Sequence, residues 1–232
     1  MCFEEIACPS CASRHVVKNG TTRNRKQKYL CRGCRRQFIR DYTYQGCRPE
    51  VRRLIVPMTL NGSGVRDITR VLRVSINTVL KVIRRAAAQT PEPHPPPRLA
   101  DVEVDEMWSF VGSKRNQSWL WYAFSPKTRE VIGYVRGRRT DAVCAELLAK
   151  LSRCQVTRFY TDWWDSYGKL IPSHRHWVGK AGTQRIERNN LTIRTRLKRW
   201  QRRTICFSKS DEMDEAVVKL FFYHRNHPHH IF

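Results

Sequence analysis

The chain has 232 residues, 41% of them hydrophobic, with 44 Lys and Arg against 20 Asp and Glu for a formal net charge of +24. This composition suits a globular protein of one or several domains, whereas no apolar run approaches a membrane span and no signal peptide opens the chain, so we expect a cytoplasmic protein. The excess of positive charge indicates a polyanionic partner, and by itself it fits a ribosomal or nucleoid-packing protein as well as an enzyme acting on nucleic acid.

Two cysteine pairs mark the first segment, residues 1–46. Each pair has Cys-x-x-Cys spacing, and 19 residues separate the pairs, which suits one tetrahedral zinc ion held by Cys8, Cys11, Cys31 and Cys34. Four thiolates leave no open coordination position, so the predicted zinc is structural. The other five cysteines are scattered and odd in number, which indicates reduced thiols rather than disulfides.

The second segment, residues 47–90, has apolar residues that recur at intervals of three and four, as in amphipathic helices. We predict three short helices, broken at "NGSG" and at "RVS", with Ser75 as the N-cap of the last one. The pattern favours a helix-turn-helix, although an ordinary three-helix unit with a solvated basic face would show the same periodicity. The candidates for contacts with base edges and phosphates are the residues of the last helix that avoid its apolar stripe: Asn77, Thr78, Lys81, Arg84 and Arg85.

Five prolines in "PEPHPPP" predict a stiff, extended linker over residues 91–98 and a domain boundary there. The third segment, residues 99–232, begins with three strand-like runs, namely "VEVDEMWSFVG", "SWLWYAFS" and "EVIGYVRG". An amphipathic helix, the strand-like "VTRFYTD", a further short strand in "RHWVG" and two more helices follow. These elements predict a mixed α/β domain with a mixed sheet.

The acidic residues of the third segment stand out in so basic a chain. Asp105 lies on the first predicted strand and Asp162 ends a later one, so their carboxylates can point to the same place. Glu187 is an isolated acid in a basic stretch, on one predicted helix face with Asn190 and Arg194. A lone surface glutamate is usually an ion-pair partner of little energetic value. Three carboxylates, however, suit two Mg²⁺ ions that perform phosphodiester chemistry, with Arg194 neutralising phosphate charge.

Residues near Glu187 are further candidates for binding the DNA backbone: Arg188, Asn190, Arg196, Lys198 and Arg199. Several other acids compete for the metal site. Glu103 shares strand parity with Asp105 and could face the metals instead, whereas Glu106 should point to the other face of the sheet.

Later acids are weaker candidates. Asp165 is the best substitute for Asp162. Glu212 or Glu215 could be a late metal ligand, but a solvated first helical turn is the favoured interpretation. We interpret the C-terminal "HRNHPHH" as an exposed end rather than a metal site.

Together these motifs resemble the insertion sequence 1 family of transposases. The runs "DEMWSFVGSKRNQSWLWYA", "YTDWWDSY" and "TQRIERNNLTIRTRL" resemble the catalytic half of that family, and "CPSC…YLCRGCRRQF" with "LNGSGVRDITRVLRVSINTVL" resembles its DNA-binding half. The motifs follow the family's order over nearly the whole chain. The chain thus looks like the fused product of the two reading frames that such elements join by frameshifting.

The resemblance implies a multidomain α+β protein with a zinc ribbon over residues 1–46, a helix-turn-helix domain over 47–90 and a ribonuclease-H-like catalytic domain over 99–232. The implied cofactors are structural Zn²⁺ and catalytic Mg²⁺ or Mn²⁺. The implied partners are double-stranded DNA, both the element ends and the target, and further copies of the chain in a homodimer or higher oligomer. The expected location is the cytoplasm of a bacterium or archaeon, at the nucleoid.

The family's acid triad (DDE) falls on Asp105, Asp162 and Glu187, and Arg194 holds the place of the basic residue that follows the glutamate. Asn189 receives no role, because some relatives carry histidine there. The implied reaction is hydrolysis of a phosphodiester at an element's end, followed by attack of the freed 3′-hydroxyl on target DNA. Two alternatives remain open: a metal-dependent nuclease without strand transfer, and a zinc and helix-turn-helix regulator whose third domain has no catalytic role.

Overall fold

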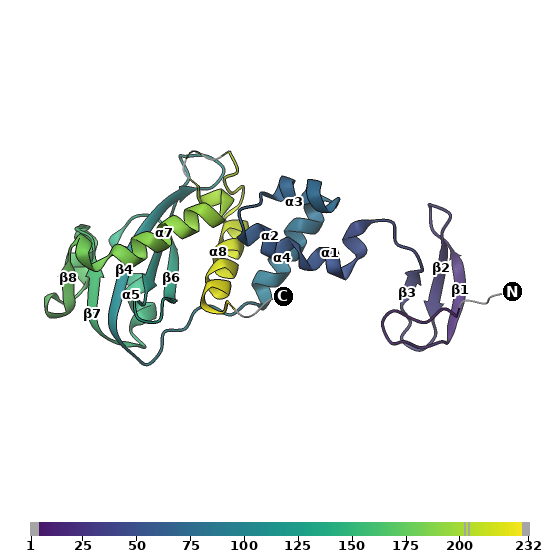
Figure 1. Ribbon diagram of the computed structural model, residues 1–232, viewed down its shortest axis with the longest axis horizontal. Helices are drawn as coiled ribbons and strands as arrows, with labels where there is room; N and C mark the ends of the chain where they lie inside the picture. Colours follow the sequence, from purple (N-terminus) through teal and green to yellow (C-terminus); the bar gives the residue numbers. More distant parts are fainter. Residues whose placement is uncertain (1–4, 202, 204, 229–232) are drawn as a thin grey trace. The chain divides into compact units, whose positions relative to one another are not determined.

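Residues 5–201, 203 and 205–228 are described by the computed structural model (Figure 1). The chain divides into two compact units, Met1–Pro49 and Glu50–Phe232. Part of the "HRNHPHH" end, His229 and His230, lies outside the described residues.

The first unit is a small antiparallel sheet with the strand order β1-β2-β3, formed by β1 (Val16–Thr21), β2 (Gln27–Cys31) and β3 (Gln37–Ile39) and followed by a 3-10 turn, η1 (Gln45–Cys47). In the described part of this unit, the buried hydrophobic cluster consists of Cys8, Cys31 and Phe38. So small a core supplies little burial energy, and domains of this size usually need a metal or disulfides to fold.

The four predicted cysteines converge beside this core. The Sγ atoms of Cys8 and Cys34 are 3.5 Å apart, those of Cys11 and Cys31 are 3.6 Å apart, and all four lie within 4.8 Å of one another. Zn–S bonds of about 2.3 Å in a tetrahedron separate the sulfurs by roughly 3.8 Å, so the donors fit zinc. Backbone amides, chiefly that of Ser10 for Cys8 and that of Cys34 for Cys31, lower the pKa of both thiols and favour the thiolates that zinc requires.

The second unit contains a five-stranded mixed sheet with the order β6-β5-β4-β7-β8. Its strands are β4 (Arg98–Phe110), β5 (Gln117–Phe124), β6 (Val131–Gly137), β7 (Gln155–Thr161) and β8 (His176–Val178). The first three form an antiparallel meander, whereas β7 pairs parallel with β4, and β8 pairs parallel with β7. The predicted mixed sheet is confirmed, including the short strand in "RHWVG".

Helices cover both faces of the sheet (Figure 1). They are α5 (Asp141–Leu151), α6 (Asp165–Leu170), α7 (Gln184–Arg196) and α8 (Asp211–Asn226), with 3-10 turns η2 (Ser173–Arg175), η3 (Lys180–Gly182) and η4 (Lys198–Trp200). Side chains alternate along the strands, so Val104 of β4 packs in the cluster that holds α5, whereas Met107 packs in the cluster that holds α7 and α8. Among the described residues, no helix combines the length and hydropathy of a membrane span.

Four helices precede the sheet: α1 (Pro49–Arg53), α2 (Ile55–Leu60), α3 (Val65–Leu72) and α4 (Ile76–Gln89). The first predicted helix is divided at Leu54, and the two predicted breaks are confirmed. Gly62 in "NGSG" has φ +85° and Arg73 in "RVS" has φ 52°, both in the left-handed region that ends helices. Ser75 caps α4 as predicted, because its Oγ accepts a hydrogen bond of 3.1 Å from the Thr78 amide.

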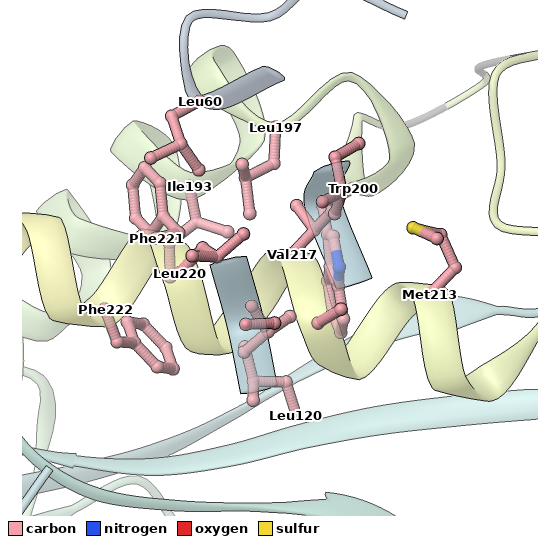
Figure 2. Close-up of a cluster of buried hydrophobic side chains, with 14 of the residues drawn as sticks. Leu60, Leu120, Ile193, Leu197, Trp200, Met213, Val217, Leu220, Phe221 and Phe222 are labelled. Atoms are coloured by element: carbon pink, nitrogen blue, oxygen red, sulfur yellow. The ribbon is translucent and has the colours of Figure 1, made fainter. Parts of the chain in front are cut away.

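The helical segment and the α/β domain, on either side of residues 91–98, share one hydrophobic core. Figure 2 shows Leu60 of α2 among Ile193, Leu197 and Phe221. The apolar stripes of these short helices are too broad to be buried within the segment alone, and α8 completes their packing. The proline-rich segment therefore does not separate two independently packed bodies.

The zinc site yields the first prediction. Cys31→Ser removes one of four thiolates, and structural zinc contributes about 10–16 kcal/mol to small sites, so the variant should lose zinc and unfold its first unit. Metal analysis and limited proteolysis of residues 5–46 measure both effects, with Cys47→Ser as the control because Cys47 is an exposed cysteine outside the cluster. Retained zinc and retained protease resistance in Cys31→Ser would show that the four thiols do not form a structural site.

Candidate active site

Two predicted carboxylates meet where β7 ends beside β4. The parallel register pairs Glu103 with Tyr160, so the same register places Asp162, one residue past β7, next to Asp105. Carboxylate oxygens of Asp105, Glu106 and Asp162 lie within 4.8 Å of one another. Oxygen donors from neighbouring strands at this spacing match the preference of a hard divalent cation.

The third member of this group, Glu106, was not expected there. Strand parity directs Glu106 to the face opposite Asp105. There Tyr167 Oη donates to Glu106 Oε2 at 2.7 Å. Arg139 donates to Glu106 Oε1 from Nε at 2.9 Å and from Nη2 at 2.6 Å. Because β7 ends at Thr161, the edge of β4 is open at this level, so side chains from both faces of β4 can approach Asp162. Glu106 thus points to the other face, as expected, yet its carboxylate still belongs to the same group as Asp105 and Asp162.

Burial and mutual repulsion disfavour the charges in this group. Burial, then the negative charges of Glu106 and Asp162, raise the pKa of Asp105 to about 7 against hydrogen bonds from Asn190 and the Glu106 amide. Burial also raises the pKa of Glu106, despite its bonds to Tyr167 and Arg139. A divalent cation bound here would offset the repulsion among these carboxylates and favour the ionised forms of Asp105 and Glu106.

A network of buried and half-buried hydrogen-bonding side chains holds helix α7 next to Asp105. Asn190 Nδ2 donates to Asp105 Oδ2, and Tyr122 Oη lies 2.7 Å from Asn190 Oδ1 and 3.1 Å from the Ile186 carbonyl. Asn189, which is 1% exposed, donates from Nδ2 to Tyr122 Oη at 3.2 Å. Asn189 therefore has a structural role that sequence reasoning did not assign.

Glu103 secures the start of the same helix. Its Oε2 accepts a hydrogen bond of 2.6 Å from the Ile186 amide, one of the free N–H groups in the first turn of α7. Burial raises the pKa of Glu103, with the Ile186 hydrogen bond opposing the shift. Of the two acids that share strand parity, Asp105 faces the carboxylate group and Glu103 anchors α7.

Glu187 lies on α7 near this group but outside it. Its side chain is exposed, and Thr183 Oγ1 is 3.4 Å from its Oε1. Glu187 is one helical turn before Asn190, which contacts Asp105, and its charge is near enough to raise the pKa of Glu103. The structure thus brings together Asp105 and Asp162 but leaves Glu187 at the rim.

Two tryptophan contacts connect Asp162 to Glu106. The Trp164 amide donates to Asp162 Oδ1 at 3.0 Å. The guanidinium carbon of Arg139 lies 3.7 Å from the centre of the Trp164 ring and 4.9 Å from the centre of the Trp119 ring. Arg139 in turn binds Glu106. Arg139 and Tyr167 act through contacts with Glu106, which is 33 and 61 residues away in the sequence, so no local pattern predicts their roles. The aromatic run "DWWDSY" is the one local sign that side chains pack around Asp162.

The remaining acids are placed elsewhere. Asp165 is exposed at the start of α6 and does not join the carboxylate group. Glu215 accepts a hydrogen bond of 2.6 Å from Tyr134 Oη, and Glu212 pairs with Arg84. In the described part of the chain, no histidine joins either group of metal-ligand type.

Four of the five predicted contacts on α4 are exposed, namely Asn77, Lys81, Arg84 and Arg85. Thr78 is half-buried and shares a hydrogen bond of 3.0 Å with Ser75. The Nε of Arg84, however, lies 3.0 Å from Glu212 Oε1, so α8 competes for this cation.

The basic residues around α7 divide into two kinds. Arg188 and Arg196 are exposed, and Arg194 and Lys198 are half-buried. Arg199 differs from the prediction, because its Nη1 donates to Ser208 Oγ at 3.1 Å and to the Met213 carbonyl at 3.4 Å, and burial lowers its pKa. Its guanidinium serves the interior of the domain rather than a phosphate.

Comparisons with known proteins match all three segments. The family profile described as IS1 transposase matches residues 99–228, the helix-turn-helix profile described as InsA C-terminal domain matches 42–86, and the zinc-ribbon profile described as InsA N-terminal domain matches 1–35. These matches support the predicted zinc ribbon and helix-turn-helix.

Similar curated proteins align with the catalytic segment. Insertion element iso-IS1n protein InsB of Shigella dysenteriae is 55% identical over 119 residues, which are 51% of this chain and 91% of that protein. Insertion element IS1 protein InsB of Shigella flexneri is 41% identical over 116 residues, 50% of this chain and 88% of that protein. Because the transposase profile covers more than half of the chain, the chain belongs to the IS1 transposase family and is a DDE-type DNA transposase.

Proposed function

We propose that this transposase cleaves element ends and joins them to target DNA at one site formed by Asp105, Asp162 and Glu187, with Mg²⁺ or Mn²⁺ as the catalytic cation. The observation that carries the proposal is the meeting of Asp105 and Asp162 at the end of β7, within 4.8 Å of each other. When bound, two divalent cations would activate the attacking oxygen and stabilise the leaving oxygen of the phosphodiester.

The chain's own residues prepare this site. Asp105 and Asp162 supply negative charge from two neighbouring strands, and Asn190 orients Asp105 by donating to its Oδ2. The Trp164 amide orients Asp162 by donating to its Oδ1. Arg194, half-buried two turns after Glu187, is the proposed partner of phosphate charge.

Glu187 is the better third carboxylate for two reasons. Both oxygens of Glu106 already accept hydrogen bonds, from Arg139 and Tyr167, and its side chain is only 2% exposed. Glu187 is exposed and lies on the helix that contacts Asp105, so its side chain is free to change rotamer, and we propose that it turns toward the group when cations bind. This assignment also follows the family resemblance of "TQRIERNN".

Three further features belong to the proposal. An antiparallel meander followed by two parallel strands supports a ribonuclease-H-like core. The exposed Lys81 and Arg85 of α4 support DNA contacts from the helix-turn-helix, with binding that weakens as salt rises. An element has two ends, so we propose that at least two copies of the chain act together, at the nucleoid in the cytoplasm.

Glu187→Gln tests the third carboxylate. Cleavage and joining should both fall by at least ~100-fold, more than the loss typical of residues outside the ligand shell, because one site performs both steps. DNA affinity should be retained, and thermal stability should change by no more than about 0.5 kcal/mol, because the side chain is exposed. The assay measures cleaved and joined products from an element-end duplex and a supercoiled plasmid in Mg²⁺, beside a gel-shift titration.

Two variants control this experiment. Glu146→Gln changes an exposed glutamate on α5 and should behave as the wild type. Glu106→Gln should lower stability by roughly 1–3 kcal/mol, because it leaves Arg139 without its buried partner. The opposite pattern would assign the third carboxylate to Glu106 instead. In that pattern Glu187→Gln joins DNA normally, and Glu106→Gln loses more activity than its unfolded fraction explains.

The pKa of Asp105 generates a prediction about pH. Its carboxyl titrates near 7 in the folded, metal-free protein but near ~4 in the unfolded chain, so between these values the folded state binds more protons. This group's contribution to stability therefore falls as pH rises from about 4 to 7 and stays low above 7.

Asp105→Asn removes that penalty. In EDTA at pH 8 the variant should melt several degrees above the wild type, since ~1 kcal/mol corresponds to about 2–4 °C at this size, and the difference should vanish near pH 4. Added Mg²⁺ should raise the melting temperature of the wild type and not that of the variant. If calorimetry in EDTA at pH 8 gave Asp105→Asn a lower melting temperature than the wild type, the buried charge of Asp105 would not destabilise the fold.

A further inference from the structure

Two adjacent tryptophans follow Asp162 and have opposite environments. Trp164 turns inward, with its amide on Asp162 and its ring against Arg139. Trp163 is 77% exposed. Trp121 and Trp200 are buried, at 0% and 1%, and Trp177 is 44% exposed, so Trp163 is the most exposed tryptophan of the chain and leaves a large aromatic ring in solvent.

A cavity of about 300 Å³ opens beside this ring. Its lining includes Asp162, Trp163, Gly168, Lys169, His176 and Val178. A Cβ added at Gly168 would meet nothing within 4 Å, so the glycine leaves open space there. His176 is fixed as one wall, because its Nε2 lies 2.7 Å from Thr161 Oγ1. The cavity is thus bordered by the Trp163 ring and by Val178, is lined by a lysine, and includes a carboxylate of the proposed catalytic site.

We propose that Trp163 stacks against a nucleobase that leaves the duplex next to the cleaved phosphodiester, and that this cavity receives that base. The inference rests on the proposed role of Asp162, which is the residue before Trp163 and lines the same cavity. Aromatic side chains bind unstacked bases of any sequence through their π faces, and enzymes that act on DNA often extrude a nucleotide at the reacting position.

The position of Trp163 favours a base over a partner protein. A ring attached to the residue that follows a catalytic carboxylate cannot be far from the DNA bound there. The chain's net charge of +24 attracts DNA phosphates to the protein, whereas Lys169 beside the ring is paired with Asp141 at 3.2 Å. Stacking on Trp163 would hold the strand open at the scissile phosphate and expose that phosphate to the attacking oxygen.

The test compares Trp163→Ala and Trp163→Phe with the wild type on two element-end duplexes in Mg²⁺. One duplex is fully paired, and the other carries mismatches over the two base pairs that flank the cleavage site. On paired DNA, Trp163→Ala should cleave about 5- to 150-fold more slowly, the rate equivalent of stacking one base, and Trp163→Phe should retain most activity. The mismatched duplex should restore much of the lost rate, because its bases leave the helix at lower cost.

Trp177→Ala is the matched control, since Trp177 on β8 is also exposed, at 44%, but does not line the cavity. It should cleave both duplexes at the wild-type rate. A wild-type rate for Trp163→Ala on paired DNA would overturn the inference. So would a defect of equal size on both duplexes, or a loss of assembly between copies of the chain with cleavage unchanged. Inactivity of the wild type itself would instead refute the proposed function, so the two failures are distinguishable.

Discussion

The parallel pairing of β4 with β7 is the constraint on which the proposed site depends. This register brings Asp162, just past the end of β7, beside Asp105 in the middle of β4. This arrangement is electrostatically unfavourable for the ionised carboxylate, because burial and the neighbouring carboxylates raise the pKa of Asp105 to about 7. Arg139 neutralises Glu106, whereas Asn190 and the Trp164 amide orient Asp105 and Asp162 without adding a positive charge. Oriented oxygen donors with this remaining negative charge suit the proposed divalent cations.

Helix α7 connects this site to the DNA-binding helices within one unit. Glu103 holds its first turn, and Asn190 holds its middle against Asp105. Its last turn meets the helix-turn-helix segment, where the ideal Cβ position of Gly62 lies 3.5 Å from the Thr195 carbonyl, and Leu60 joins the core around Ile193. The same helix carries Glu187, so a continuous packed core joins the proposed third carboxylate to the helix-turn-helix segment. If α4 binds the element end as proposed, this core sets the separation between that end and the proposed catalytic site.

Local signals in the sequence predicted the elements well. The cysteine spacing, the Ser75 cap and the turn at Gly62 depend on neighbouring residues, and the structure has all of them. Strand parity also distinguished Glu103 and Asp105 from Glu106, but it could not show that the open edge of β4 lets Glu106 reach Asp162. Non-local packing explains the other differences: Arg199 turns inward to Ser208, and α8 binds the helical segment despite the intervening prolines.

The central claim is that carboxylates from β4, from the end of β7 and from α7 share the catalytic cations. The most direct measurement is a crystal structure of the chain with element-end DNA and Mn²⁺, with data collected at the manganese absorption edge to locate the ion. The account predicts anomalous density between Asp105 and Asp162, with Glu187 moved from the rim into contact with the metal. Manganese bound away from Asp105 and Asp162, or completed by Glu106 while Glu187 stays in solvent, would contradict it.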